Sequence, residues 1–481
     1  MSIQLIVILI YFALTVVIGL LSNRKAKSAD AFTGAGLGVL ACVCASTGEW
    51  LGGTATTGVS EYGFDFGISG SWYTLANGIG VIFLALLFAE LYRSMESVTV
   101  PGIIGKFLGV KARTVSSVFL TFVMLAVGIS QMIAAGSLGV SLLGLDFNIT
   151  VCAFAVVFIV YTLAGGMQAV ASTNVMHLFA MYGGAIVAVI LALTKVGGIG
   201  AVKEALPSSY FNMTSIGMPK VSSWVIASLL GACTAQAGIQ PILAAKDVKT
   251  AKKASIITAF VAAPFGLLTA ALGMIAKTMS VNGQLLNTVG ENVTSGKLAL
   301  PTLMMNLSPI AGGIILASIL AAILSTVSPL ILASGTMITK DIYQGVIKKD
   351  ASDKQVLFAS RVTTAISGVI CTIAAIFFNA TGIRVLDIVY FAYSMRGALF
   401  VIVLLGIYYK KTSEKGAICG MLCTAVVGLF WVVFNAVTGH FPIPGVTETY
   451  ISVAVALVST LIFSAIFKKQ QTEELKETIS K

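Results

Sequence analysis

The chain has 481 residues, of which 57% are hydrophobic and only 10% are charged. Soluble globular domains carry about 25% charged residues, so this composition excludes a protein whose main solvent is water. Apolar runs of roughly 20 residues recur along the whole chain, and each is long enough to cross a hydrocarbon core of about 30 Å as a helix. We therefore expect one all-α, polytopic membrane domain over residues 1–481, without a separate soluble domain.

Thirteen membrane spans are predicted from these apolar runs. Their approximate ranges are 3–22, 35–60, 70–93, 117–144, 149–168, 174–194, 222–244, 255–278, 308–338, 357–379, 386–408, 416–438 and 448–467. The first run differs from a signal peptide, because no basic stretch precedes it and its apolar part is too long. We therefore expect residues 3–22 to be retained as an extra N-terminal helix.

The basic residues are distributed unevenly between the two sides of these spans. With the N-terminus outside, 22 of the 30 Lys and Arg residues fall in the inner connections and the polar tail 468–481, and only six fall in the outer connections. Basic residues favour the cytoplasmic side, so this bias predicts an external N-terminus and a cytoplasmic C-terminus in the cell membrane. Topology explains the net charge of +11, and we expect no nucleic-acid partner.

All seven cysteines lie inside predicted apolar segments, with no spacing typical of a metal site and no partner in an exposed loop. They are Cys42, Cys44, Cys152, Cys233, Cys371, Cys419 and Cys423. We interpret them as small buried residues rather than disulfides.

Two of the spans are rich in glycine and polar residues at mid-depth, where an uninterrupted helix would satisfy its own backbone groups. The second span contains CASTGEWLGGT (44–54) and the seventh contains GACTAQAGIQP (231–241). Each opens a group of five helices, at 35–194 and 222–408, and the two groups begin on opposite sides of the membrane. This pattern predicts an inverted repeat with ion and solute sites at the breaks. Alternatively, the glycines only permit close helix packing.

The ninth span carries two adjacent hydroxyls, Ser325 and Thr326, shortly before Pro329. The proline prevents a normal backbone hydrogen bond, so both side-chain oxygens could turn toward a cation, and sodium prefers such neutral oxygens. The alternative is that the hydroxyls bond back to carbonyls of their own helix, as Ser and Thr commonly do.

Three segments carry a resemblance to a known family. They are ASILAAILSTVSPLILASGTMITKDIY in and after the ninth span, YTLAGGMQAVASTNVMHLF at 161–179 and AAKDVKTAKKA at 244–254. The first resembles the signature segment of the sodium/solute symporter family, which includes sodium-coupled sugar, proline, pantothenate and sialic-acid carriers. With the order of landmarks preserved, the resemblance extends over nearly the whole chain.

The resemblance implies a leucine-transporter-like fold with one helix before a ten-helix core and two helices, 416–467, after it. It also implies a sodium site formed by carbonyls of the second span and by a carbonyl and two hydroxyls of the ninth. By matching motif positions, the expected ligands are the carbonyls of Cys44, Thr47 and Ala322 and the side chains of Ser325 and Thr326. The second-span match is anchored at Trp50, and a shift of one residue is the alternative.

The sixth span departs from the family pattern. The family often has an acidic residue there with Gln three positions later, whereas this chain has Asn174 and His177. The departure questions a role of this span in sodium exit, though not the main sodium site. We interpret His177 as a hydrogen-bonded interior residue, with proton coupling as the alternative.

Two ionisable residues are expected near the midplane, Glu49 in the second span and Arg396 in the eleventh. Charges at this depth are costly and usually functional. In the functional interpretation, Arg396 holds a solute carboxylate, because its planar fork suits anions, while Glu49 receives an amine or hydroxyl. In the alternative interpretation, the two form a structural ion pair. Further predicted solute-binding residues are Ser46, Trp50, Gln131, Gln236 and Gln240.

The function predicted from these features is sodium:solute symport of a small polar solute into the cell by alternating access, and Arg396 favours a solute that bears a carboxylate. We expect no enzyme, because the sequence contains no nucleotide-binding loop, no HExxH motif and no catalytic partners for its two histidines. The alternatives are a proton-coupled carrier of the same fold and a solute sensor without transport. The predicted partners are sodium, the solute and the lipid bilayer, and the oligomeric state is left open.

Overall fold

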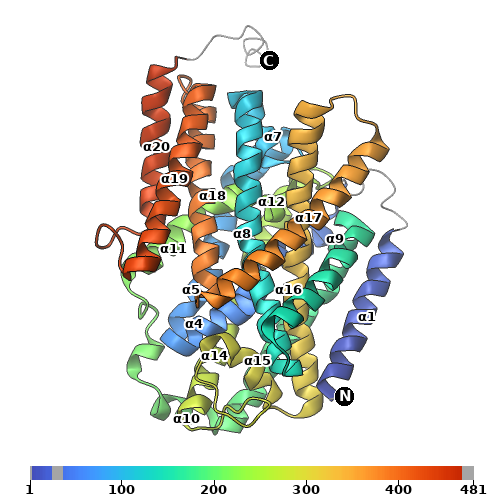
Figure 1. Ribbon diagram of the computed structural model, residues 1–481, viewed down its shortest axis with the longest axis vertical. Coiled ribbons are helices and arrows are strands. Elements are labelled where there is room, and N and C mark those ends of the chain that lie inside the picture. Colours follow the sequence, from blue (N-terminus) through green and yellow to red (C-terminus); the bar gives the residue numbers. More distant parts are fainter. Residues whose placement is uncertain (1–2, 24–35, 469–481) are drawn as a thin grey trace.

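The computed structural model of the protein describes the backbone of residues 3–23 and 36–468, and their side chains except at residues 16, 19–23 and 164–171 (Figure 1). Most of the first predicted inner connection and residues 469–481 of the predicted tail lie outside this part. The described chain forms a bundle of helices, many of which run along the long axis of the molecule (Figure 1). The prediction of an all-α protein is confirmed.

The elements up to the seventh predicted span are α1 (Ile3–Asn23), α3 (Val39–Trp50), η1 (Thr54–Gly58), α4 (Val59–Phe66), η2 (Gly67–Ser71), α5 (Trp72–Leu87), α6 (Ala89–Ser94), α7 (Val100–Leu108), α8 (Val110–Leu143), α9 (Phe147–Val196), α10 (Gly198–Ala205), η3 (Ser208–Phe211), α11 (Met218–Gly231), η4 (Ala232–Thr234) and α12 (Gln236–Leu243). The remaining elements are α13 (Val248–Ala262), α14 (Phe265–Val281), α15 (Gly296–Met305), α16 (Pro309–Met337), η5 (Ile338–Ile347), α17 (Asp353–Ala380), α18 (Val385–Tyr408), α19 (Glu414–Thr438) and α20 (Glu448–Ile466).

Nine helical segments of the described chain are long and apolar enough to cross a membrane, and the bent pair Met218–Thr234 and Gln236–Leu243 makes a tenth. Three further apolar helices are shorter: Ile3–Thr15, Val39–Trp50 and Phe147–Leu163. The predicted number of thirteen spans is therefore not confirmed. One physical reason is that the chain stays helical across predicted connections, since α9 contains both the fifth and the sixth predicted spans.

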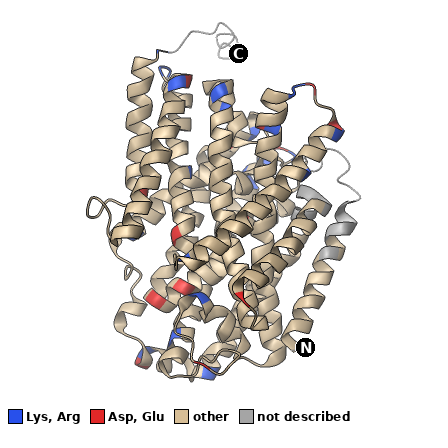
Figure 2. Cartoon of the chain, in the orientation of Figure 1, with Lys and Arg blue, Asp and Glu red and all other residues tan. Residues whose placement is uncertain are grey.

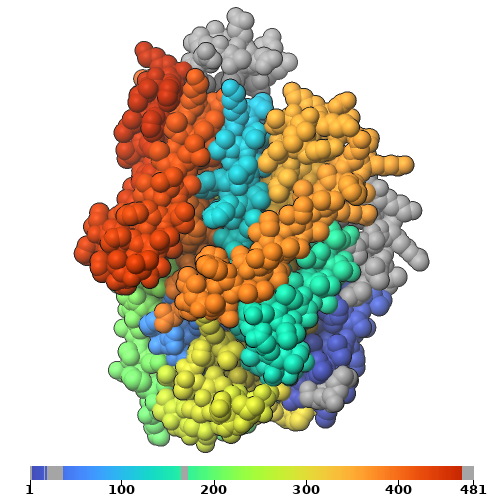
Figure 3. All heavy atoms as spheres, in the orientation of Figure 1, coloured from blue at the N-terminus to red at the C-terminus, as the bar shows by residue number. Residues whose placement is uncertain are grey.

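Helix α16 is the central helix of the bundle. In its most apolar window 94% of the residues are buried inside the protein, against 28% for α20, which faces outward. It contacts α1, α3, α8, α9 and α17. Figures 1 and 3 show α17 lying obliquely across this side of the bundle. A helix that is hydrophobic all round belongs in such an interior position, because every face has a packing partner.

Charged residues lie mostly toward the two ends of the bundle (Figure 2). The middle of the molecule is dominated by uncharged residues, as a hydrocarbon environment requires. The few charged residues in this middle region therefore need neighbours that neutralise them or form hydrogen bonds with them.

Helices α4 and α14 approach closely through glycines on both sides. A Cβ at Gly63 would lie 2.4 Å from the Ala270 carbonyl oxygen, and a Cβ at Gly273 would lie 2.2 Å from the Ser60 carbonyl oxygen. Real Cβ atoms do not come this near to backbone. Membrane helices commonly associate through small residues in this way, because lipid provides no hydrophobic drive for their contact.

We predict that Gly273→Ala lowers the thermal midpoint of the detergent-solubilised protein by several degrees. The added methyl group must push α14 from α4, and overpacking of this kind costs about 1–3 kcal/mol. The matched control is Gly183→Ala in α9, where a Cβ would meet nothing within 4 Å. It should leave the midpoint unchanged or raise it, because Ala is the better helix former. Equal midpoints for the two variants would contradict the close contact.

Candidate functional site

Helix α3 ends in the middle of the second predicted span. Its last backbone hydrogen bond joins the Leu51 amide to the Thr47 carbonyl at 3.0 Å, and helical bonding resumes with the Thr56 amide on the Gly52 carbonyl at 3.1 Å. The Thr56 hydroxyl also donates to the Gly53 carbonyl at 3.2 Å. Hydroxyls thus satisfy carbonyls near the break, which water would satisfy in a soluble protein.

The seventh predicted span is broken as well, and the two breaks touch. The chain bends by 42° between Thr234 and α12. The Ser46 hydroxyl of α3 donates to the Gly238 carbonyl of α12 at 2.8 Å. A Cβ at Gly238 would lie 2.9 Å from the Trp50 ring and 3.4 Å from Glu49 Cγ, so only glycine permits this contact.

Glu49 and Arg396 form an ion pair where the two breaks meet. Glu49 Oε1 lies 2.8 Å from Arg396 Nη2, and both side chains are completely buried. The hydroxyl of Thr234, at the second break, donates to the Arg396 carbonyl at 2.7 Å. The pairing is incomplete, because Glu49 Oε2 and Arg396 Nε and Nη1 have no hydrogen-bond partner among the described residues. Buried polar atoms without partners are uncommon, and a bound water, ion or ligand is the usual explanation for them.

A layer of aromatic side chains borders this pair. The guanidinium of Arg396 lies 4.4 Å from the centre of the Tyr393 ring. The Tyr393 and Tyr73 hydroxyls are hydrogen-bonded at 3.1 Å. Trp224 and Tyr390 stack with ring centres 4.3 Å apart and planes within 6°. These rings belong to α5, α11 and α18 and are at most 1% exposed, so the pair is closed off along this side.

Ion pairs and a charged hydrogen bond lie next to the aromatic layer and join α4 to the first turn of α18. The Tyr62 hydroxyl donates to Asp387 at 2.6 Å, and Lys220 of α11 lies 3.1 Å from the same carboxylate. Arg384 pairs with Asp65 at 3.1 Å. The four charged side chains are between 28% and 40% exposed, so these are partly solvated bonds. Ties of this kind contribute little each, about 0–1 kcal/mol.

The predicted ninth-span hydroxyls lie in α16 against the broken end of α3. Ser325 Oγ donates to the Ala322 carbonyl at 2.8 Å, and Thr326 Oγ1 donates to the same carbonyl at 3.3 Å. Thr326 Oγ1 also donates to the Gly48 carbonyl. A Cβ at Gly48 would lie 2.4 Å from the Ser325 carbonyl oxygen, so the two backbones are in direct contact.

The predicted second-span ligands, Cys44 and Thr47, are both buried in α3. The carbonyl of Thr47 accepts the hydrogen bond from Leu51 described above, and its hydroxyl has no partner among the described residues. The carbonyl that Thr326 contacts is that of Gly48, one position later. This contact corresponds to the one-residue shift left open by the sequence. The ligand set itself stays a prediction.

The two departures in the sixth span both lie in the interior. Asn174 Nδ2 donates to the Ser325 carbonyl at 3.4 Å, which places the Asn174 amide beside the predicted sodium ligands. His177 Nδ1 is hydrogen-bonded to the Tyr11 hydroxyl of α1 at 2.6 Å. His177 is thus an interior residue held by a hydrogen bond, as the first interpretation of it expected.

Three of the other predicted solute-binding residues lie around the break of the second span. Ser46 already donates to α12, as described above, whereas Trp50 Nε1 has no partner within the described chain. The Gln131 amide nitrogen donates to Thr54 Oγ1, and its oxygen is without a described partner.

Gln236 and Gln240 lie on α12, beyond the break. Gln236 Oε1 accepts a hydrogen bond from the Val100 amide at 2.8 Å, and Nε2 donates to the Val98 carbonyl at 3.1 Å. A weak contact of 3.5 Å joins it to Gln240. The amide oxygen and nitrogen of Gln236 are therefore bonded to Val100, the first residue of α7, and to Val98, two residues before it.

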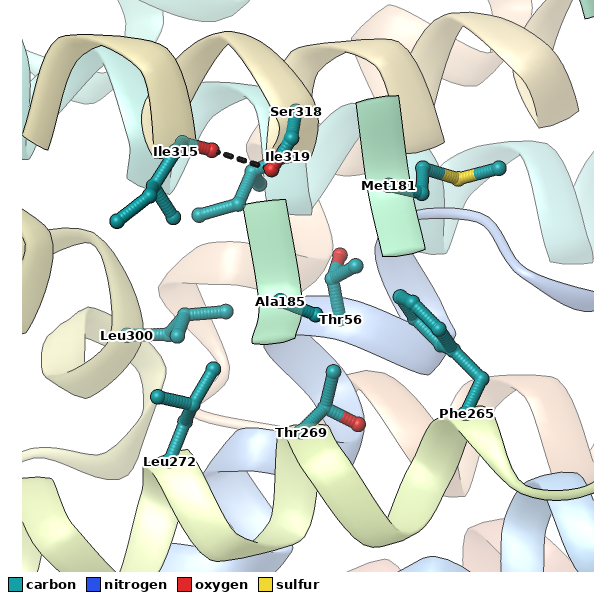
Figure 4. A pocket seen from close by; sticks show the side chains of 10 residues that line it. All are labelled: Thr56, Met181, Ala185, Phe265, Thr269, Leu272, Leu300, Ile315, Ser318 and Ile319. Carbon is teal, nitrogen blue, oxygen red and sulfur yellow. Dashed lines mark hydrogen bonds between the residues drawn. The ribbon is translucent and has the colours of Figure 1, made fainter. Parts of the chain in front are cut away.

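A small pocket lies elsewhere in the bundle, between η1, α9, α14, α15 and α16 (Figure 4). Its three hydroxyls, on Thr56, Thr269 and Ser318, all donate to backbone carbonyls. The rest of its lining is apolar, and it contains none of the predicted site residues. We interpret it as a packing gap rather than the solute site.

Asp341, with its partners Arg113 and Thr99, is among the buried polar groups that sequence reasoning missed. The available signal was a carboxylate directly after a long apolar span, in the segment MITKDIY. Because that position falls in a basic inner connection, the charges there were interpreted only as topology.

Comparison with known proteins identifies the family of the chain. The family model "Sodium:solute symporter family" matches residues 32–424. The osmoregulated proline transporter OpuE of Bacillus subtilis is 25% identical over 98% of this chain and 96% of its own length. The sodium/proline symporter of Escherichia coli is 25% identical over 92% of this chain and 90% of its own.

Solved structures share the fold. A sodium-coupled sialic acid symporter in a substrate-bound outward-open state superimposes with a TM-score of 0.79 at 19% identity, covering 98% of this chain and 99% of its own. MhsT in complex with L-phenylalanine gives a TM-score of 0.56 at 15% identity, covering 89% of this chain and 98% of its own. The fold is thus leucine-transporter-like. The family match shows that the protein is a membrane transporter rather than an enzyme. With a family model matched over most of its length, the chain belongs to the sodium:solute symporter family.

Proposed function

We propose that this sodium-coupled symporter binds a small solute at the Glu49–Arg396 pair, with a solute carboxylate on Arg396 and an amine or hydroxyl on Glu49. The observation that carries the proposal is the incomplete pairing of these two residues. Two buried donors of Arg396 and one buried acceptor of Glu49 have no described partner. An unsatisfied buried group costs about 1–3 kcal/mol, and more when charged, so a ligand that supplies the missing bonds is favoured.

The zero net charge of the pair favours a solute that is zwitterionic or uncharged. Because Glu49 and Arg396 cancel, a solute with net charge would leave that charge uncompensated in a region where isolated charges are expensive. A zwitterion matches both partners at once. The Tyr393 ring, 4.4 Å from the Arg396 guanidinium, adds an apolar wall, which typical small-molecule sites combine with a few polar groups.

We further propose that sodium binds where α3 meets α16. The proposed oxygens are the hydroxyls of Ser325 and Thr326 and the Ala322 carbonyl, together with carbonyls of α3. The predicted α3 carbonyls are those of Cys44 and Thr47, and the Thr326 contact supports Gly48 as a ligand instead. Sodium binding would stabilise the state open to the outside, because coupling requires different affinity in the two states.

The internal organisation is proposed to be an inverted repeat of residues 35–194 and 222–408, with α1 before it and α19 and α20 after it. The contact of the two broken spans through Ser46 and Gly238 supports this division, since equivalent breaks of such repeats meet at the site. The orientation is proposed to be N-terminus outside and C-terminus cytoplasmic, from the distribution of basic residues.

The orientation predicts which loops an impermeant maleimide reaches on intact cells. In a Cys152→Ser background, Asn282→Cys between α14 and α15 should be labelled, because that loop faces outward. Asp350→Cys, between η5 and α17, should be labelled only after permeabilisation. Both positions are exposed in the fold, so accessibility within the protein does not confound the comparison. The reverse pattern would invert the proposed topology.

The double variant Ser325→Ala, Thr326→Ala is expected to raise the sodium KM for uptake by about tenfold or more, which corresponds to about 1.4 kcal/mol of lost binding. Ser334→Ala is the matched control, since Ser334 lies on the same helix and its hydroxyl donates to the Leu330 carbonyl at 2.9 Å. Its sodium KM should equal that of the wild type. An unchanged sodium KM in the double variant would move the ion site elsewhere.

The pair is tested by Glu49→Gln and Arg396→Gln, alone and combined. Each single variant leaves one buried charge unpaired, which costs about 3–5 kcal/mol, so both should lower the thermal midpoint and abolish uptake. The combined variant should recover much of the midpoint, because no net charge remains buried. If the pair binds solute, uptake and solute-dependent thermal stabilisation stay absent in the combined variant. Recovery of uptake together with the midpoint would mean that the pair is only structural.

A further inference from the structure

The segment at the end of α16 holds a buried carboxylate that the proposed sodium and solute sites do not use. Asp341 in η5 is completely buried. Its Oδ1 atom accepts hydrogen bonds from Arg113 Nε at 2.8 Å and from Thr99 Oγ1 at 3.0 Å, and lies 2.7 Å from Arg113 Nη2. Arg113 also donates to the Lys340 carbonyl at 3.0 Å. One carboxylate thus joins η5 to the start of α8 and to the segment before α7.

The residues around Thr99 are also bonded to the broken seventh span. The amide of Gln236 bonds to Val98 and Val100, the two residues that flank Thr99. Gln236 is completely buried and is the first residue of α12 after the bend. The polar chain therefore runs from α12, through residues 98–100, to Asp341 and Arg113.

The start of α3 is tied to the end of α12. The Leu37 amide donates to the Ala244 carbonyl at 2.9 Å, and the Lys246 amide donates to the Leu37 carbonyl at 3.0 Å. Arg93 Nε adds a bond to the Ala245 carbonyl at 2.8 Å. A displacement of α12 would therefore carry the first residues of α3 with it, and these two half-helices lead away from the Glu49–Arg396 pair.

We propose, on the basis of the orientation proposed above, that Thr99, Arg113, Gln236 and Asp341 form a latch that closes the inner half of the transport route. While the latch is intact, α12 and α3 are held against α8 and η5, and the solute cannot leave between them. Release of the Gln236 amide or of the Asp341 carboxylate frees α12 to move. In this proposal Asp341 and Gln236 are positioning residues for transport that act through residues 98–100, and Gln236 has this role instead of the predicted contact with solute.

The latch differs from the ion pairs next to the aromatic layer, and this difference supports the assignment. In Arg384–Asp65 and Lys220–Asp387 both side chains are partly exposed, whereas in the latch Arg113 is 32% exposed and the Asp341 carboxylate is completely buried. Water can replace partners in the first set during opening but cannot reach Asp341 without movement of the backbone. Release of the latch therefore requires the Asp341 carboxylate to become hydrated, which the outer ion pairs do not require.

The test uses a native cysteine as the reporter. Cys233 lies in η4, three residues before Gln236, and is completely buried. A thiol reacts only when it becomes accessible, so its alkylation by N-ethylmaleimide reports opening beside α12. Two other native cysteines are internal controls: Cys371, buried in α17, reports unfolding, and the exposed Cys152 reports reagent activity. Site-resolved mass spectrometry measures all three rates in the full-length, detergent-solubilised protein.

Asp341→Asn is expected to raise the alkylation rate of Cys233 by about tenfold, while the rates of Cys371 and Cys152 stay at wild-type values. The matched control is Asp350→Asn, the same change at an exposed position nine residues later, which should leave all three rates unchanged. A folded Asp341→Asn protein with the wild-type Cys233 rate would overturn the latch.

A second variant covers the case in which Asp341→Asn unfolds the protein and exposes Cys371 as well. Gln236→Leu keeps the size of the side chain and removes its bonds to Val98 and Val100 while leaving the Asp341–Arg113 pair in place. It should raise the Cys233 rate alone, and an unchanged rate would overturn the proposal. These measurements use no solute and no sodium gradient, so their outcome is independent of the proposed solute and sodium sites.

Discussion

The structure depends on one constraint, that a backbone group exposed to hydrocarbon has no water to bind. Helices meet this constraint along their length, and the two broken spans must meet it by other means. Here the breaks satisfy each other: the Ser46 hydroxyl covers the Gly238 carbonyl, and hydroxyls of the second span cover carbonyls near its own break. Gly238 is required because any Cβ would collide with Trp50. The central location of the ion pair follows from this docking, since Glu49 lies at the end of one broken helix and Arg396 is held by Thr234 beside the other break.

The two ends of the route are closed by bonds of different character. On one side, partly exposed ion pairs lie above a layer of buried rings, and each pair contributes little on its own. On the other, the fully buried Asp341 carboxylate gathers bonds from two elements. The side chains of the first set already contact water, whereas the Asp341 carboxylate has none and becomes hydrated only when the backbone around it moves.

Much of this arrangement was predictable from sequence, because it concerns residues that violate a simple rule. Glycine-rich polar stretches inside apolar spans marked both breaks, and isolated charges at mid-depth marked Glu49 and Arg396. Other features gave no such signal. Asp341 lies in a segment where charge is expected, and its partner Arg113 is 228 residues away along the chain, so only the fold brings them together. The number of separate helices was not predictable either, because a hydropathy minimum does not require the helix to end, as α9 demonstrates. Gln236 was predicted to bind solute because it lies in the broken span. In the fold its amide is bonded to Val98 and Val100, and such tertiary contacts are not visible in the sequence.

The cancellation of charge between Glu49 and Arg396 has an electrical consequence. At the proposed site, Glu49 and Arg396 together add no net charge to the reorientation of the carrier, and a zwitterionic solute adds none. A co-transported sodium ion adds one elementary charge, on which the membrane potential acts with about 2.3 kcal/mol for every 100 mV. The voltage dependence that the site contributes to uptake is then the one that sodium brings.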